Sequence, residues 1–215
     1  MPSASTRLTL CQQHSFNAGL YTLSSPPQTT RARILEATLA LIARAPGPIA
    51  MGAIAKEAGL SRQALYLTFA DKADLFVALL RYVDGKRGLV QELAAIRDAP
   101  TAREALAMIL DLQARLNPGY KPIVDAFEVL RRQDPAAESA WRDRQDHRLE
   151  GSRAVIARLA AEGRLRPGLD PALAADLLWT LTSVAVWDDL VTQRGWSAEA
   201  YRDHLHAQLV AWLVG

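Results

Sequence analysis

The sequence places a short helix, a glycine turn and a second short helix within residues 54–69, and this spacing constrains the fold more than any other feature. A helix-turn-helix joins two short helices, which cross at about 90–120°, through a turn of three or four residues. Ala55 provides the small side chain where the second helix passes over the first, and Gly59 can adopt the positive φ that the turn requires. Apolar side chains must fill the angle between the helices, and the sequence provides them at Ile54, Leu60 and Leu65.

The second helix of this unit is predicted to have a buried side and an outward side. At about 100° per residue, Leu65 and Phe69 point inward, whereas Gln63 and Leu67 point almost directly away from them. The outward side, with its flanks and its N-terminal end, presents these candidate DNA contacts: Arg62, Gln63, Ala64 and Tyr66. Arg and Gln side chains can read the edges of guanine and adenine, and a Tyr hydroxyl can donate to a phosphate. The alternative is that the unit only packs helices together and that this side is a solvated face.

The rest of the chain also follows the three-to-four spacing of amphipathic helices, and no alternating strand pattern competes with it. We therefore expect an all-α fold of about nine helices. Helix starts are predicted after residues that can cap an N-terminus, namely Ser61, Asp71, Thr101, Asp134, Asp170 and Ser197.

Three helix boundaries depend on how glycine and proline are interpreted. The helix over about 71–90 is expected to continue through its two glycines. Residues 117–119 (Asn-Pro-Gly) are expected to separate a helix over about 101–116 from another over about 122–132. A further helix is predicted without interruption over about 170–193.

The charge balance excludes a general coat of basic charge. The 215 residues contain 25 Lys and Arg and 23 Asp and Glu, a formal net charge of +2. Residues 1–75 hold 7 basic and 4 acidic residues, and residues 76–215 hold 18 and 19. Any binding of nucleic acid must therefore come from a local patch. The single cysteine, Cys11, excludes an internal disulfide and a multi-cysteine zinc site.

No segment of the sequence has the roughly 18 consecutive apolar residues of a membrane span. The N-terminus also lacks the basic and apolar pattern of a signal peptide. We expect a cytoplasmic protein with no membrane partner.

Residues 29–77 resemble the N-terminal domain of the TetR/AcrR family of transcriptional regulators. The matching stretches are Arg33-Ile34-Leu35-Glu36-Ala37, Ile54-Ala55 to Ser61, and Leu65-Tyr66-Leu67-Thr68-Phe69-Ala70-Asp71-Lys72-Ala73-Asp74-Leu75-Phe76. The last stretch is similar to the family pattern Leu-Tyr-x-His-Phe-x-x-Lys-x-x-Leu. The resemblance implies three N-terminal helices that bind DNA and a helical C-terminal body that dimerises and holds a small molecule.

The resemblance also implies roles for particular residues. Arg62, Gln63 and Ala64 would face bases, and Tyr66 and Lys72 would hold phosphates. Thr30 and Arg31, at the start of the first helix, are further phosphate candidates. The sequence departs from the family at three positions, where it has Ala50 in place of a capping residue, Gly52 in place of a basic residue and Thr68 in place of histidine. These departures predict a modest affinity for the DNA backbone.

The expected organisation has three parts. Residues 1–28 form an N-terminal arm, partly disordered, residues 29–75 form the helix-turn-helix domain, and residues 76–215 form the body. Dimerisation is predicted along two apolar stripes in the last two helices, one containing Leu177, Leu181 and Val184 and the other Tyr201, Leu205, Leu209 and Trp212. The alternative is that both stripes pack inside one monomer.

The effector pocket is predicted from aromatic and apolar side chains of the body, with Met108, Tyr120, Phe127, Trp141 and Trp179 as candidates. Aromatic residues at helical spacing are also typical of an ordinary core. The charged residues 142–146, before His147, are predicted to be a solvated face.

No motif of an enzyme, a metal site or a cofactor site is found in the sequence, so we expect none of these functions. We expect a homodimeric repressor that a small-molecule effector, not identified by the sequence, releases from a palindromic operator in double-stranded DNA. The alternative is a helical ligand-binding or interaction protein without sequence-specific DNA binding.

Overall fold

The computed structural model describes residues 29–44 and 48–215, and the regular structure in this part of the chain is helical. The predicted all-α fold is confirmed, with ten α-helices and one π-helical segment in place of about nine helices. They are α1 (Thr30–Arg44), α2 (Met51–Glu57), α3 (Arg62–Thr68), α4 (Lys72–Lys86), α5 (Leu89–Arg97), α6 (Ala102–Arg131), α7 (Pro135–Ala161), α8 (Pro171–Leu181), α9 (Val184–Trp187), the π-helix η1 (Asp188–Gln193) and α10 (Ala198–Leu213). The predicted N-terminal arm, residues 1–28, lies outside the described residues.

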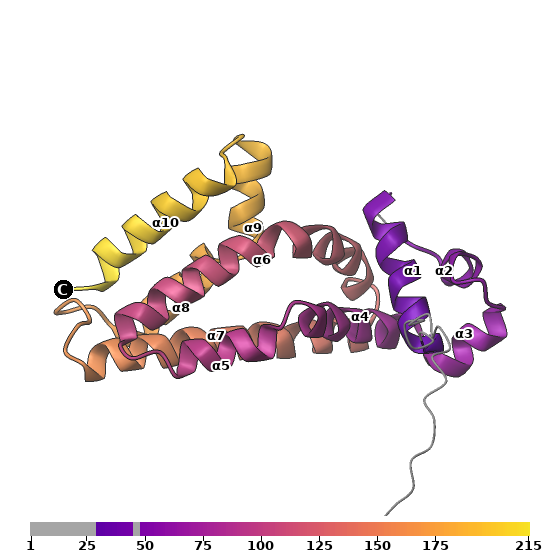
Figure 1. Ribbon diagram of the computed structural model, residues 1–215, viewed down its shortest axis with the longest axis horizontal. Coiled ribbons are helices and arrows are strands. Elements are labelled where there is room, and N and C mark those ends of the chain that lie inside the picture. Colours follow the sequence, from indigo (N-terminus) through magenta and orange to yellow (C-terminus); the bar gives the residue numbers. More distant parts are fainter. Residues whose placement is uncertain (1–28, 45–47) are drawn as a thin grey trace, which may run out of the picture.

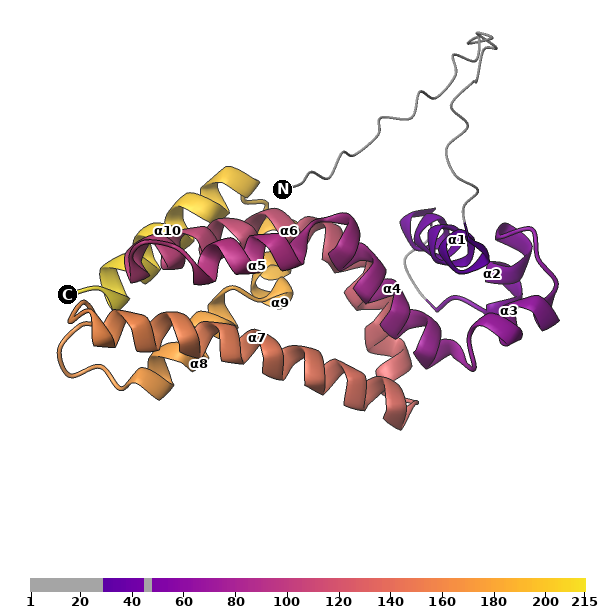
Figure 2. The same cartoon turned by 60° about the horizontal axis from the view of Figure 1, so that its bottom comes forward.

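Helices α1, α2 and α3 form one end of the molecule, and α4 leads from them into the body (Figures 1 and 2). The turn between α2 and α3 is built as its sequence predicts, because Gly59 has φ 64°. Ser61 then caps α3 by accepting a hydrogen bond from the backbone N–H of Ala64 at 3.1 Å. Ala50 precedes α2 without a side-chain cap, as its methyl side chain requires.

The buried side of α3 anchors the helix-turn-helix. Leu65 and Phe69 are both 0% exposed, and they join Ile34 of α1 and Ile54 of α2 in the core. The same core continues without interruption through α4 into the body. Burial of a side chain of this size stabilises a fold by about 1.5–3 kcal/mol. The two inward side chains therefore fix which face of α3 is left outside.

In the body, the long helix α7 packs mainly against α6 and α8, and α10 packs mainly against α6. Figure 2 shows the second half of α6 and the start of α7 beside α4, so three helices meet where the body begins. Considering only the described residues, no helix is long and apolar enough to cross a bilayer.

The predicted break at residues 117–119 is wrong, since α6 continues through Pro118 and Pro122 to Arg131. Figure 1 shows that α6 curves over in this half. The guanidinium of Arg87 lies against Gly119, in the space that an added Cβ would take. Arg87 also donates to the carbonyl of Leu116 at 3.2 Å. The side chain of Arg87, the C-cap residue of α4, thus supports a proline-containing helix segment that would be weak alone.

Two further boundaries differ from the prediction. The helix expected over 71–90 ends at Lys86, because Gly88 adopts φ 65° and separates α4 from α5. The helix expected over 170–193 breaks after Leu181, and Ser183 starts a new helix by capping it. At this break the side chain of Asn117 donates to the carbonyl of Thr182 at 3.3 Å. A partner from α6 therefore takes the place of a helical hydrogen bond.

Candidate nucleic-acid interface

The outward face of α3 carries the polar residues that the sequence predicts there. Arg62, Gln63 and Tyr66 are exposed, and Ala64 is half-buried beside them. Tyr66 is 51% exposed although the residue before it, Leu65, is fully buried. Helix α3 is therefore anchored from one side only and leaves two whole turns of its other side accessible.

Arg62 does not extend freely from α3 but lies over the start of α2. An added Cβ at Gly52 would be 2.6 Å from Nη2 of Arg62 and 2.9 Å from its Nε. Gly52 is the position at which the family pattern has a basic residue. The guanidinium of Arg62 therefore occupies space that a side chain at position 52 would take. Because residue 52 is glycine, the guanidinium of Arg62 can lie against the first turn of α2.

The predicted phosphate ligands lie at the starts of α1 and α4. Arg31 is exposed, its guanidinium lies 4.3 Å from the ring centroid of Phe69, and it donates to the carbonyl of Thr68 at 3.4 Å. Thr30 is exposed as the first residue of α1. Lys72 is half-buried as the first residue of α4, and burial lowers the pKa of its ammonium group. Arg31 therefore lies at the C-terminal end of α3, and Lys72 follows that end along the chain.

The start of α4 is held by a reciprocal cap. Asp71 accepts from the backbone N–H of Asp74 at 2.8 Å, and Asp74 accepts from the backbone N–H of Ala70 at 3.1 Å. This is a variant of the capping box, because Asp74 bonds the N–H of Ala70, one residue before the N-cap Asp71, and not the N–H of the N-cap itself. It fixes the position of Lys72 relative to α3.

Leu67 was not assigned a role from the sequence, but it is 82% exposed on α3. The helical periodicity already directed this side chain away from Leu65 and Phe69. It was not among the DNA contacts predicted from the sequence, because a leucine side chain forms no hydrogen bond with a base or a phosphate. A leucine in this position can contact the methyl group of thymine in the major groove.

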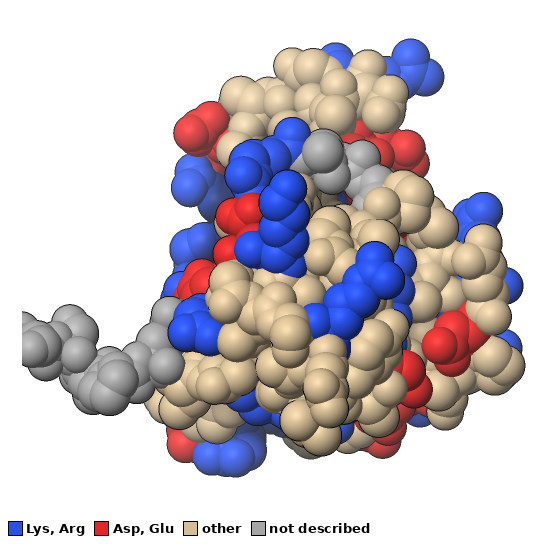
Figure 3. Space-filling view, turned by 90° about the vertical axis from the view of Figure 1, so that its right-hand side faces the viewer, with Lys and Arg blue, Asp and Glu red and all other residues tan. Residues whose placement is uncertain are grey.

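Figure 3 views the helix-turn-helix end of the molecule. It shows Lys and Arg side chains separated by uncharged surface, with Asp and Glu side chains also present, and no continuous basic stripe. This agrees with the small net charge of the chain. Binding of a polyanion at this end depends on a few placed cations rather than on bulk charge.

Helix α4 is tied to α1 of the helix-turn-helix end. Glu36 of α1 accepts hydrogen bonds from Tyr82 at 2.5 Å and from Lys86 at 2.6 Å. The bond from Lys86, and then that from Tyr82, lower the pKa of the Glu36 carboxyl. These contacts hold α1 against the second half of α4.

Helix α4 is also tied to the body. Asp84 forms an ion pair with Arg144 of α7 at 2.7 Å and accepts a hydrogen bond from Tyr120 of α6. Burial, together with the bond to Asp84, raises the pKa of Tyr120 to about 12. Arg144 belongs to the charged run predicted to be a solvated face, and that prediction is wrong for Arg144. Its neighbour His147 is exposed as predicted.

The candidate pocket residues of the body are only partly brought together. Phe127 and Trp141 are in ring contact, with centroids 5.7 Å apart. Tyr120 is buried and bonded to Asp84, and Trp179 lies against Arg148 of α7. Met108 is half-buried in the first two turns of α6.

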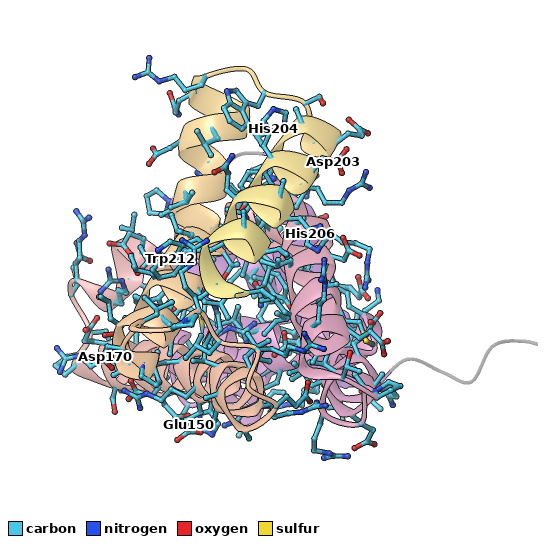
Figure 4. All side chains as sticks on the ribbon, turned by 90° about the vertical axis from the view of Figure 1, so that its left-hand side faces the viewer. Glu150, Asp170, Asp203, His204, His206 and Trp212 are labelled. Atoms are coloured by element: carbon cyan, nitrogen blue, oxygen red, sulfur yellow. The ribbon has the colours of Figure 1, made fainter. Side chains whose placement is uncertain are left out.

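The predicted dimerisation stripes differ in accessibility. Tyr201 and Leu209 are 0% and 2% exposed because they pack inside the chain, so in this conformation their side chains are not accessible to a second copy. The other predicted residues are half-buried and accessible in part, namely Leu177, Leu181, Val184, Leu205 and Trp212. Figure 4 shows α10 at the surface of the body, with His204 and Asp203 in its first half and Trp212 near its end.

Comparisons with known proteins agree on this end of the molecule. Residues 34–79 match the family model of the N-terminal domain of bacterial regulatory proteins of the tetR family. A comparison of the sequence with curated proteins gave no match.

Solved structures with the same fold cover most of the chain. A putative transcriptional regulator from Saccharomonospora viridis, solved with choline, is 24% identical over 86% of this chain and 97% of its own, with a TM-score of 0.71. FadR from Bacillus subtilis, solved with stearoyl-CoA, is 20% identical over 84% and 97%, with a TM-score of 0.68. NalD, the secondary repressor of the MexAB-OprM multidrug efflux pump in Pseudomonas aeruginosa, is 22% identical over 86% and 96%, with a TM-score of 0.63.

Proposed function

Since the chain belongs to the TetR family of bacterial regulatory proteins, we propose that it is a transcriptional regulator that reads double-stranded DNA with the outward face of α3. The observation that carries this proposal is the contrast along α3 between buried Leu65 and exposed Gln63 and Tyr66. Gln63 and Arg62 contact base edges in the major groove, and Ala64 lies against the same surface. Tyr66, Lys72, Thr30 and Arg31 contact phosphates.

We propose that two copies bind a palindromic operator. The accessible parts of α8 and α10 form the contact between copies, as a four-helix interface made from Leu177, Leu181, Val184, Leu205 and Trp212. The two-fold symmetry of such a dimer places two α3 helices about 34–36 Å apart, one turn of DNA. The division of the chain at about residue 75, where α4 begins to leave the helix-turn-helix, follows from the same proposal.

We propose that the protein is a repressor and that a small molecule bound in the body releases it from DNA. Three compared proteins support this in outline, because NalD is a repressor and the other two were solved with choline and with stearoyl-CoA. Helix α4 connects the two functions through Glu36 on one side and Asp84 on the other. The action is binding alone, with no catalytic step, and it takes place in the cytoplasm, where the chromosome is.

Selection of bound duplexes from a random pool tests the proposal. The wild-type protein is expected to enrich a palindrome whose half-sites are about one helical turn apart. Gln63→Ala is expected to lose part of the enriched motif, whereas Gln91→Ala on exposed α5 is the matched control and leaves it unchanged. A wild-type protein that enriches no motif contradicts the proposal and favours a helical ligand-binding protein.

A further inference from the structure

Arg148 lies on the inner side of α7, where it meets α8. Its Nη1 donates to the side-chain oxygen of Gln145 at 2.9 Å, and its Nη2 donates to the backbone carbonyl of Trp179. The guanidinium carbon lies 4.9 Å from the ring centroid of Trp179. Both of these partners are neutral, so the charge of Arg148 is solvated by dipoles and an aromatic ring.

Two other partly buried arginines of α6 and α7 have carboxylate partners instead. Arg131 forms ion pairs with Glu128 and Glu138, and Arg144 forms one with Asp84. In the described part of the chain, no carboxylate forms an ion pair with Arg148. Burial lowers the pKa of its guanidinium to about 10, and the nearby charge of Arg144 acts in the same direction. A partly buried cation without a counter-ion is costly, and an anion at this place would offset the cost.

Hydrogen-bond donors without a partner lie in α8 and α9, and one of them belongs to the Trp179 side chain that Arg148 contacts. The indole N–H groups of Trp179 and Trp187 are buried and have no partner among the described residues. Tyr201 packs against Trp187 and interacts electrostatically with Arg148. Burial raises the pKa of Tyr201 to about 12, so its hydroxyl stays protonated, and it donates to the backbone carbonyl of Leu181 at 3.5 Å. Asp188, the residue after Trp187, has one buried carboxylate oxygen, Oδ1, without a hydrogen-bond partner. Its other oxygen, Oδ2, lies 3.4 Å from Nζ of Lys121.

The backbone beside these donors is irregular. Helix α8 ends at Leu181, α9 contains four residues, and η1 continues as a π-helix over Asp188–Gln193. Segments of π-helix occur frequently at functional sites, where they re-aim side chains at some cost in regularity. The break places Trp179 before it and Trp187 after it, with Tyr201 of α10 against the second.

We infer that Arg148 binds the anionic group of an amphipathic effector, with the indole N–H groups of Trp179 and Trp187 as further donors. The anion is a carboxylate, sulfonate or phosphate, and the apolar part of the molecule lies against the indole rings. This inference rests on the proposed function, because it names the chemical class of the effector that the body binds. The anionic group also accepts hydrogen bonds from the two buried indole N–H groups, which have no partner in the described part of the chain.

Two dyes that differ only in an anionic group test the inference. 8-Anilinonaphthalene-1-sulfonate and N-phenyl-1-naphthylamine share one aromatic body, and only the first carries a sulfonate. The wild-type protein is expected to bind the sulfonate dye more tightly, and Arg148→Met is expected to lower that affinity about ten- to a hundredfold. The affinity for the neutral dye stays within about twofold in the same variant, because it makes no charged hydrogen bond. The ratio of the two affinities is the readout, since a loosened fold would raise binding of both dyes.

Two further variants separate charge from packing. Arg148→Lys is expected to recover part of the preference for the sulfonate dye, because it restores the positive charge without the two-pronged geometry. Arg153→Met is the matched control, since Arg153 lies on the same helix and is exposed. Thermal unfolding followed by circular dichroism checks that each variant is folded.

The inference is overturned if the wild-type protein shows no preference for the sulfonate dye, including the case in which it binds neither. It is also overturned if Arg148→Met keeps the wild-type ratio. These measurements contain no DNA, so they are independent of the proposed regulatory function. A sulfonate preference that depends on Arg148, without any change in DNA affinity on dye binding, supports the anion site and counts against release by such a ligand.

Discussion

Arg144 donates through both terminal nitrogens to the carboxylate of Asp84, at 2.7 and 3.0 Å, and this fork joins α7 to α4. The two residues are 60 positions apart in the chain. The other end of α4 begins with Lys72 beside α3, and Glu36 holds its second half to α1. A shift of α7 therefore acts on α4 through Asp84, and α4 contacts the helix-turn-helix through Glu36. In an allosteric regulator, such a coupling is typically worth about 1–3 kcal/mol.

Asp84→Asn is expected to destabilise the protein by roughly 2 kcal/mol, because it leaves the Arg144 charge without a counter-ion. The side chains are 18% and 30% exposed, so the loss stays below that of a fully buried pair. Chemical denaturation followed by circular dichroism measures it. In the double variant with Arg144→Met, the loss is expected to be smaller than the sum of the single losses by about 0.5–3 kcal/mol. Additive losses would show that the two side chains do not interact.

Glu36→Gln is expected to lower stability near neutral pH by roughly 1 kcal/mol, since it removes the charge that Lys86 and Tyr82 contact. The folded-state pKa of Glu36 is lowered from 4.5, so its contribution is complete above that value. It is lost as the pH falls through the lowered folded-state pKa. Denaturant unfolding of both proteins at a series of pH values is expected to show the difference shrinking towards zero in acid. A difference that does not depend on pH would contradict an electrostatic role.

Gly52→Ala is expected to raise stability by up to about 1 kcal/mol, because alanine favours the helical backbone of α2. The new methyl group would meet the guanidinium of Arg62 at 2.6 Å, and this flexible side chain must move. The variant is therefore expected to be more stable but to discriminate duplexes less well, at the same base positions as Arg62→Ala. Thermal unfolding and a repeat of the duplex selection measure the two effects. An unchanged motif would show that Arg62 does not read DNA from this position.

Leu67→Ala is expected to weaken binding to the selected duplex by about 1 kcal/mol if Leu67 buries a thymine methyl group. Replacing each thymine of a half-site by uracil removes that methyl group without changing a hydrogen bond. One such replacement is expected to weaken the wild-type protein by a similar amount and to have no effect on Leu67→Ala. Fluorescence anisotropy with labelled duplexes measures all four affinities. Equal effects of uracil on both proteins would show that Leu67 does not contact a thymine methyl group.

Local sequence rules predicted six of the helix starts correctly. Each of the six predicted capping residues accepts a hydrogen bond from a backbone N–H at the start of its helix: Ser61, Asp71, Thr101, Asp134, Asp170 and Ser197. A cap depends on residues two or three positions away, so the information lies within the segment itself. The turn at Gly59 and the inward direction of Leu65 and Phe69 were predictable for the same reason.

Helix interiors were harder to predict, because contacts from other helices decide them. Arg87 supports α6 through its two prolines, and Asn117 stabilises the break after α8. The neutral environment of Arg148 likewise depends on Trp179, which is 31 residues away. No local pattern contains these pairings. The candidate DNA face was therefore accessible from the sequence, whereas the interior of the body required the structure.

The interface on α3 is tested most directly by comparing a selected duplex with a scrambled one in fluorescence anisotropy at several salt concentrations. Gln63→Ala is expected to lose about 1–3 kcal/mol on the selected duplex and almost nothing on the scrambled one. Lys72→Ala is the matched comparison, expected to weaken both duplexes equally and to lower the salt slope by roughly one. Equal losses on both duplexes for Gln63→Ala, or no loss at all, would contradict the reading of DNA by the outward face of α3.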